Sequence, residues 1–461
     1  MKKILFTLLG CMVLASCNNE VEQMVTNFEE QHDVLSVNEE ENSNVTLADI
    51  QAYMDKGSDI ASRNGGDGEI EVVTYQNDTV MYLLKYADGW EMMPSDKRFP
   101  LRVAYNDEGT LDYANMHDAQ RAWFESIAEE IHVMKKHGKG IENEYCKVWN
   151  ALTKKNKKKD NHKSRSENGE WILHNTREVV SIEEISHLIS TNWAAWSERS
   201  YSGKPDFNMY CPIDSILQKH DLVAYAAVCG AQVLYHFHKL WGIPATMPRN
   251  AVYIDGEYQF GVWDSSQWTE IAKGDTNVDN GMEAIALLLG HVNSLCGPVG
   301  SDPSAYSDLP YALGKYGIGC SRMQTWDNNI IRNNINSNRP IIGDITGTMV
   351  DTSVRNTLII DGYKYISTTY TDVYIYINEP GSYTGDMYDH DESGNPVPEE
   401  GPSQEETYTI NDMYYMVKWG SGYVDNTYYL SYNPINYDYG SGIGIVPYNR
   451  NKKMLYDFYI K

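Results

Sequence analysis

The sequence lacks the motifs of several large protein classes. Its 7 cysteines are widely spaced among 461 residues and include no Cys-x-x-Cys pair, which argues against a disulfide framework or a zinc site of paired cysteines. It contains no His-Glu-x-x-His, Walker or dinucleotide-binding motif, and Ser265-Ser266 has no Gly-x-Ser-x-Gly frame. Metalloprotease, nucleotide-binding and serine-hydrolase functions therefore have no support.

Positive charge is also scarce. The chain has 38 Lys and Arg against 64 Asp and Glu, a net charge of −26. Nucleic acid and anionic lipid surfaces repel such a protein, so we expect no nucleic-acid partner. The 42% of hydrophobic residues are sufficient for a packed core.

No segment is apolar for long enough to span a bilayer. Lys2 and Lys3 precede an apolar run over residues 4–15, which is too short to cross about 30 Å of hydrocarbon and is typical of a signal peptide. The run ends in Leu14-Ala15-Ser16-Cys17, the pattern of bacterial lipoproteins. Residues 1–16 are then removed, and lipid on Cys17 anchors the chain to a membrane of the cell envelope, at the outer membrane or cell surface. An ordinary signal peptide with a chance cysteine is the alternative.

Composition divides the remaining chain into four parts. Residues 17–45 are polar and acidic, as in a flexible tether. Residues 46–135 form a small unit, with a helix predicted at 47–56, strands at 71–74, 79–86, 90–93 and 101–105, and a closing helix at 119–134. Residues 136–170 contain a basic stretch, which predicts a solvated linker or helix end, or else a protease-sensitive junction. Its charged residues are Lys154, Lys155, Lys157, Lys158, Lys159, Lys163 and Arg165.

Residues 171–461 predict helices first and strands afterwards. The most apolar helix is expected at 221–241, followed by helices at 282–295 and 326–337. Strands are expected at 340–345, 356–363, 372–378, 414–419 and 427–430. This order is typical of an α+β fold with an antiparallel sheet.

Several stretches of this second part resemble the streptopain family of papain-like cysteine peptidases. Tyr210-Cys211-Pro212, followed by Ala-Tyr-Ala-Ala-Val-Cys-Gly-Ala-Gln-Val-Leu-Tyr-His at 224–236, is similar to the family's Cys-Pro segment and nucleophile helix. Leu-Ile-Ile-Asp-Gly-Tyr at 358–363 resembles the strand after its catalytic His. Val-Lys-Trp-Gly at 417–420 resembles its Asn-Trp-Gly-Trp segment, and Tyr-Tyr-Leu at 428–430 the strand that follows.

The small first unit resembles the inhibitory propeptide of the same family. Residues 79–109 match its motif at Trp90, Asp96, Pro100, Leu101, Tyr105 and Gly109. The resemblance therefore covers most of the chain after the tether. It implies a papain-like fold, with a central helix packed on an antiparallel sheet, preceded by a small α+β propeptide-like domain.

The catalytic positions depart from the family pattern. The resemblance places the family's nucleophilic Cys at Tyr225, its general-base His at Asn356 and the orienting Asn at Lys418, while the neighbouring Trp419 is kept. The oxyanion-hole Gln falls at Ala195. A phenol with a pKa near ~10 is a poor acyl acceptor, and an amide cannot act as a base. The resemblance therefore implies an inactive member of the family, a pseudopeptidase.

An active enzyme with a displaced nucleophile is the alternative. Cys229 lies one turn beyond Tyr225 on the same helix face. It would sit away from the helix terminus that activates a thiol, and core packing is the simpler role. Cys211 is a second candidate for the displaced nucleophile.

One pattern resembles a calcium loop. Asp389-x-Asp391-x-Ser393-Gly394 with Glu400 at the twelfth place matches the EF-hand loop, except for Ser at the fifth position. Calcium is one interpretation, and a solvated acidic loop is the other. No further cofactor is expected.

The predicted function is therefore that of a lipid-anchored surface protein that binds or regulates without proteolysis. Its ligand would be a peptide or a protein, including a related peptidase that the propeptide-like unit could recognise. A purely structural surface component is a third possibility.

Overall fold

A computed structural model describes most of the chain after the tether. The described residues are 43–55, 68–114, 116, 118–137, 143–153, 170–193, 207–213, 220–243, 251–254, 257–260, 266–274, 281–296, 304–323, 325–349, 352–377, 389–390, 396–397, 403–419, 424–430 and 453–461. The predicted lipidation residue Cys17 lies outside them. No helix of the described part is long and apolar enough to cross a membrane.

The first part of the chain folds largely as its pattern predicts. Helix α1 (Leu47–Asp55) begins with a capping box, in which Thr46 and Asp49 exchange hydrogen bonds with each other's backbone N–H groups. Four antiparallel strands follow, and helix α3 (Asp118–His137) closes the unit. The strands are β1 (Glu69–Tyr75), β2 (Asp78–Lys85), β3 (Trp90–Pro94) and β4 (Ala104–Asn106).

Helix α4 (Glu144–Thr153) lies within the stretch that the sequence predicts as a linker. Its Trp149 is fully buried, and the Trp149 indole N–H donates to the carbonyl oxygen of Phe99 at 3.2 Å. Tyr145 reaches the other way, to Asp412 of a distant strand, at 2.9 Å. These two side chains hold the helix between the first and last parts of the chain.

One antiparallel sheet runs through both halves of the molecule. Its strand order is β1-β2-β3-β4-β14-β13-β10-β9-β15-β8, and β5 pairs with β10. The two halves join where Ala104 and Tyr105 of β4 pair with Tyr429 and Tyr428 of β14. The later strands are β5 (Glu170–Ile185), β8 (Ile318–Met323), β9 (Ile341–Met349), β10 (Thr352–Ile377), β13 (Ser403–Trp419), β14 (Val424–Leu430) and β15 (Lys453–Ile460).

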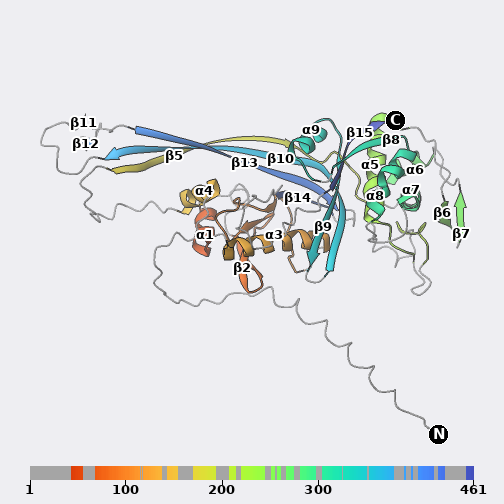
Figure 1. Cartoon of the computed structure of the whole chain (residues 1–461), viewed down its shortest axis with the longest axis horizontal. Coiled ribbons are helices and arrows are strands. Elements are labelled where there is room, and N and C mark those ends of the chain that lie inside the picture. Colours follow the sequence, from red (N-terminus) through yellow and green to blue (C-terminus); the bar gives the residue numbers. More distant parts are fainter. Residues whose placement is uncertain are drawn as a thin grey trace, which may run out of the picture.

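Strand β10 corrects a prediction. The sequence predicts two strands, at 356–363 and 372–378, but the structure has one strand of 26 residues. Its outer half is flanked on both sides, by β5 and by β13, and these three strands form a long arm that projects from the body (Figure 1). The intervening residues are mainly Ser, Thr and Tyr, which suit a strand but show no apolar alternation.

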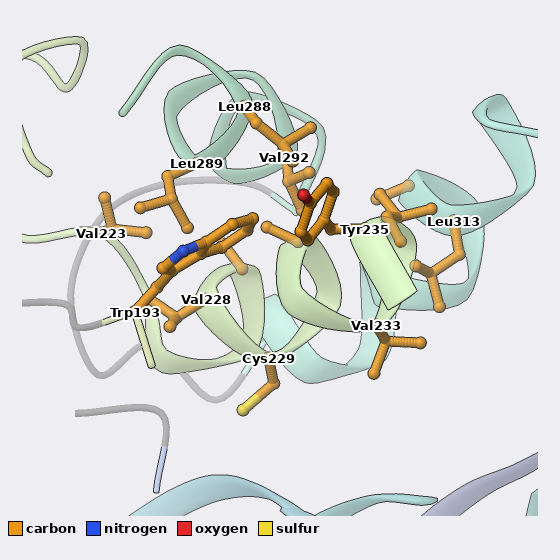
Figure 2. Close-up of a cluster of buried hydrophobic side chains, with 14 of the residues drawn as sticks. Trp193, Val223, Val228, Cys229, Val233, Tyr235, Leu288, Leu289, Val292 and Leu313 are labelled. Atoms are coloured by element: carbon orange, nitrogen blue, oxygen red, sulfur yellow. The ribbon is translucent and has the colours of Figure 1, made fainter. Parts of the chain in front are cut away.

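Helices cover the other end of the sheet. Helix α5 (Tyr225–Trp241) is almost entirely buried and packs against α7 (Met282–Cys296), α8 (Ser304–Lys315) and β10. Figure 2 shows the cluster of apolar side chains around α5. The remaining elements are α6 (Ser266–Gly274), α9 (Asn328–Asn336) and two small hairpins, β6–β7 (Ala251–Ile254, Glu257–Phe260) and β11–β12 (Asp389–His390, Pro396–Val397).

The fold is therefore a mixed α+β architecture built on an antiparallel sheet. Its hydrophobic interior crosses the boundary between the two sequence halves. One buried cluster joins Trp90 and Phe124 to Tyr363, Trp419 and Tyr429. A second cluster joins α1 and Trp149 to Tyr414 and Met416 of β13.

Candidate functional site

Helix α5 begins at Tyr225. The helix was expected from residue 221, but Ala224 is extended, with φ −61° and ψ 139°. The backbone N–H of Ala224 donates to Asn293 Oδ1 at 2.9 Å, which fixes the chain just before the first turn. Tyr225 is half-buried. The residue at the predicted nucleophile position therefore stands at a helix N-terminus, where the dipole would favour a thiolate.

Cys229 lies one turn further along α5 and is fully buried. Figure 2 shows it projecting from the helix on the side opposite Leu288, Leu289 and Val292. Burial raises the pKa of the Cys229 thiol well above its usual value, so the nucleophilic thiolate is not formed near neutral pH. Cys211 is also buried, next to Asn293. Neither cysteine has the exposed, electropositive surroundings of a reactive thiol.

The segment after β5 is fastened to α5 by Gln232. The side-chain oxygen of Gln232 accepts hydrogen bonds from the Thr191 hydroxyl at 3.0 Å and from the Trp193 backbone N–H at 3.2 Å. Gln232 is buried and belongs to the Ala-Gln pair on which the resemblance is aligned. The indole of Trp193 packs against Tyr235. The structure thus brings residues 191–193 against the nucleophile-like helix; Ala195 lies outside the described residues.

Lys418 joins the same segment to strand β13. Its side chain is only 5% exposed, and its Nζ donates to the carbonyl oxygen of Thr191 at 3.2 Å. Burial lowers the pKa of Lys418, and the negative charge of Asp361 partly opposes this effect. The side chain at the place of the family's orienting Asn therefore joins strand β13 to the 191–193 segment through Thr191.

Asp361 and His187 form a pair that the sequence interpretation missed. Asp361 is fully buried in β10, and its Oδ1 lies 2.6 Å from His187 Nδ1. Its Oδ2 accepts the backbone N–H of Ile189 at 3.1 Å. The other ring nitrogen of His187, Nε2, is buried and has no hydrogen-bond partner among the described residues. The pair fixes the start of the 187–193 segment on the sheet.

The remaining family positions are placed only in part. Trp419 is buried, and its ring meets that of Tyr429 edge to face at 5.6 Å. Asn356 lies in β10 opposite Ile345 of β9, and its side chain lies outside the described part. Thr191 therefore links two of the elements that carry family positions, because it bonds to Gln232 of α5 and to Lys418 of β13.

Only one of the predicted calcium ligands lies within the described residues. Asp389 belongs to β11, where its backbone pairs with Val397, whereas Asp391, Ser393 and Glu400 lie outside the described residues. Within the described part of the chain, no group of three or more His, Cys, Asp or Glu side chains could hold a metal ion. Calcium stays a prediction.

Comparison with known proteins gives little. No protein-family model and no curated protein matches the chain. A solved structure, active wild-type interpain A cysteine protease from Prevotella intermedia, is 13% identical and covers 59% of this chain and 94% of that chain, at a TM-score of 0.32. A TM-score this low establishes neither fold nor activity for this chain.

The described site holds a phenol, a buried amine and a His–Asp pair that supports a loop. Acyl transfer needs an activated nucleophile and a base within hydrogen-bond reach of it. His187 is engaged with Asp361 through one nitrogen, and its second nitrogen is buried. The described contacts fasten the loop to the helix and the sheet.

Proposed function

We propose that this chain is a lipid-anchored pseudopeptidase of streptopain-like, papain-like architecture that binds a peptide or protein ligand at the bacterial cell envelope. The observation that carries the proposal is Tyr225 at the first residue of α5. This is where papain-like peptidases hold their nucleophilic Cys, and a phenol with a pKa near ~10 cannot replace a thiolate.

Lys418 supports the same conclusion. In an active enzyme the side chain at this place would orient a catalytic histidine, whereas Lys418 is buried and bonded to Thr191. An ammonium group has three donors and no acceptor, so it cannot receive the N–H of an imidazole. Restoring proteolysis would therefore require changes on at least two elements.

The alternative, a working peptidase with Cys229 as nucleophile, has no observation in its favour. Burial holds this thiol in its protonated form, and a substrate cannot reach a side chain with no exposed surface.

The contacts of the first unit support one kind of ligand over another. Its β4 strand pairs with β14, and Tyr105 packs edge to face on Tyr414 of β13 at 5.2 Å. Because the unit is joined to this chain's own sheet, it cannot offer that surface to another peptidase. We therefore favour a peptide or an unrelated surface protein as ligand.

Hydrolysis of casein and labelling by a thiol-directed probe test the proposal. We expect neither above background for the wild-type chain, and no change in Cys229→Ala. Turnover and labelling that both vanish in Cys229→Ala would overturn the proposal. The triple variant Tyr225→Cys, Asn356→His, Lys418→Asn should acquire probe labelling at residue 225, because a thiol would then stand at the helix N-terminus.

Lipidation is tested separately. Metabolic labelling with a fatty-acid analogue should mark the wild type and not Cys17→Ser, and the variant should leave the membrane fraction. Equal labelling of both chains would refute the anchor without touching the pseudopeptidase proposal.

A further inference from the structure

The outer edge of strand β5 has no partner strand in the described structure. Strand β5 pairs with β10 from Glu170 to Ile185, and no other described strand pairs with it. A long edge strand presents backbone N–H and C=O groups that can pair with another chain. In Figure 1 this edge belongs to the arm, which extends away from helices α5, α7 and α8.

Apolar side chains stand exposed on this edge. Val179 is 68% exposed, Val180 49% and Ile182 55%. Successive residues of a strand point to opposite faces, so Val179 lies on one face of the arm, and Val180 and Ile182 lie on the other. Apolar side chains are thus exposed to solvent on both faces of the arm along this edge. Exposed apolar patches mark interaction sites.

The usual protection of an edge strand is missing from residues 179–182. Proteins guard such edges with charged side chains, especially lysine, and with proline or a bulge. The stretch reads Val-Val-Ser-Ile, with no charge and no Pro, and its nearest charges are Glu178 and Glu183 at its two ends. The only irregularity in the pairing with β10 is opposite Val373 and Tyr374, before this stretch begins. The four central residues of this edge therefore carry none of these protections.

The charges on β5 select its partner. Arg177 stands on one side of Val180 and Glu183 on the other, each three residues away. In an antiparallel pair of two β5 strands centred on Val180, each Arg177 faces Glu183 of the second copy. A parallel pair would set Arg177 against Arg177. Moving the centre to lie between Val180 and Ser181 would set Glu178 against Glu183, which destabilises the pair.

The present contacts of Arg177 and Glu183 leave both side chains able to pair with a second copy. Arg177 is paired at 3.3 Å with Glu405, but both side chains are more than half exposed, and such pairs contribute little. Glu183 is bonded to Arg332 and Tyr363, and a carboxylate can accept further donors.

The opposite edge of the arm is a poorer candidate. Residues 403–413 of β13 pair only with β10 among the described strands. That edge has Glu405 and Glu406, which engage Arg177 and Lys147. It shows no exposed large apolar side chain in the described part.

We propose that two copies of this chain associate through antiparallel pairing of their β5 strands, centred on Val180. The two three-stranded arms then form one continuous sheet across a two-fold axis, with the same surface used by both copies. In this register Val180 meets Val180 of the second copy, while Val179 lies opposite Ser181 and Ile182 opposite Glu178. This association is independent of the proposed function.

Sedimentation of the full-length protein in detergent tests the proposal. The wild type should sediment as a dimer. Val180→Lys and Val180→Glu should each be monomeric at the same concentration, with at least about tenfold weaker self-association, because like charges then face each other at the centre. An equimolar mixture of the two variants should form dimers again, since Lys then faces Glu.

Thr407→Lys on β13 is the matched control, because Thr407 is an exposed residue of the same arm and is not on β5. It should remain dimeric, and circular dichroism should show that all variants are folded. A monomeric wild type would overturn the proposal, as would dimers that persist in both Val180 variants. Chain-like polymers abolished by Thr407→Lys would also overturn it, since β5 would then pair with β13 of the next copy.

Discussion

At the scale of single residues, Asp361 shows how one buried carboxylate can hold a loop in place. It accepts hydrogen bonds from His187 and from the backbone of Ile189, and its charge acts on Lys418. Removing a buried charged partner is costly because the polar groups that remain stay buried without a partner.

We therefore expect Asp361→Ala to lower the free energy of unfolding by about 3–5 kcal/mol. Urea denaturation followed by tryptophan fluorescence measures it. The control is Glu405→Ala, which breaks the exposed pair with Arg177 and should change the same quantity by less than about 1 kcal/mol. Equal effects of the two substitutions would contradict the role given to Asp361.

Asp412 makes stability depend on pH. Burial raises the pKa of Asp412 from 3.8 to about 6, although the Tyr145 hydrogen bond and the charge of Arg102 oppose the effect. The folded protein thus binds a proton more tightly than the unfolded chain. The stability from this proton is fully present below about pH 4 and is lost as the pH rises through about 6.

Asp412→Asn should remove this dependence while keeping an acceptor for the Tyr145 hydroxyl. The measurement is the difference in urea midpoint between variant and wild type at pH 4, 5, 6 and 7. We expect the variant to gain stability relative to the wild type as the pH rises across this window. A constant difference would show that Asp412 does not titrate there.

At the scale of elements, close packing between α7 and the Cys211 segment depends on a glycine. A Cβ at Gly290 would lie 2.7 Å from Tyr210 Cβ and 3.0 Å from the Tyr210 carbonyl oxygen. Backbone cannot move aside as a flexible side chain can. Gly290→Ala should therefore destabilise the protein by about 1–3 kcal/mol despite the better helix propensity of alanine.

Gly314 in α8 gives the matched comparison. A Cβ there would meet only the side chain of Lys461, whose end is free to move. Gly314→Ala should be neutral or stabilising by up to about 1 kcal/mol. Thermal denaturation of both variants measures the difference. A loss of stability in Gly314→Ala as large as that in Gly290→Ala would contradict the packing explanation.

Elements with one buried face could be predicted from the sequence, and elements of the arm could not. The helix at 282–295 and the strand at 79–86 appear almost where their apolar patterns place them. Strand β5 and the middle of β10 were missed because residues such as Val179 and Thr369 lie in an arm that is open to solvent. Alternation of apolar residues arises only where one face is buried.

The candidate site could be addressed from the sequence only in part. Tyr225 and Lys418 could be assigned to family positions because each sits within a recognisable stretch of neighbours, and these assignments stay predictions. The His187–Asp361 pair could not, because the two residues are 174 positions apart and neither belongs to a motif that requires the other. Only the packing of β10 beside the loop after β5 brings them together.

At the scale of the whole molecule, the two halves of the sequence share one sheet and a common interior. The β4–β14 pairing is reinforced by Gln120, whose side-chain nitrogen donates to the Tyr429 hydroxyl at 2.9 Å. Trp123 meets the Tyr429 ring edge to face at 4.9 Å. Separating the halves would expose this interior to water, which is unfavourable for each apolar side chain.

Cutting the chain between the halves should therefore not release the second half. A recognition sequence for a site-specific protease, inserted between residues 160 and 161, allows one cut in the folded protein. We expect both fragments to co-elute in size-exclusion chromatography after cleavage, and to separate only in urea. With Cys17 lipidated, both would also stay in the membrane fraction.

The double variant Trp123→Ala, Tyr429→Ala removes two large buried rings and should lower the urea concentration at which the fragments separate. Fragments that separate in buffer would show that the shared sheet does not bind the halves together, and cleavage could then release the second half from its anchor.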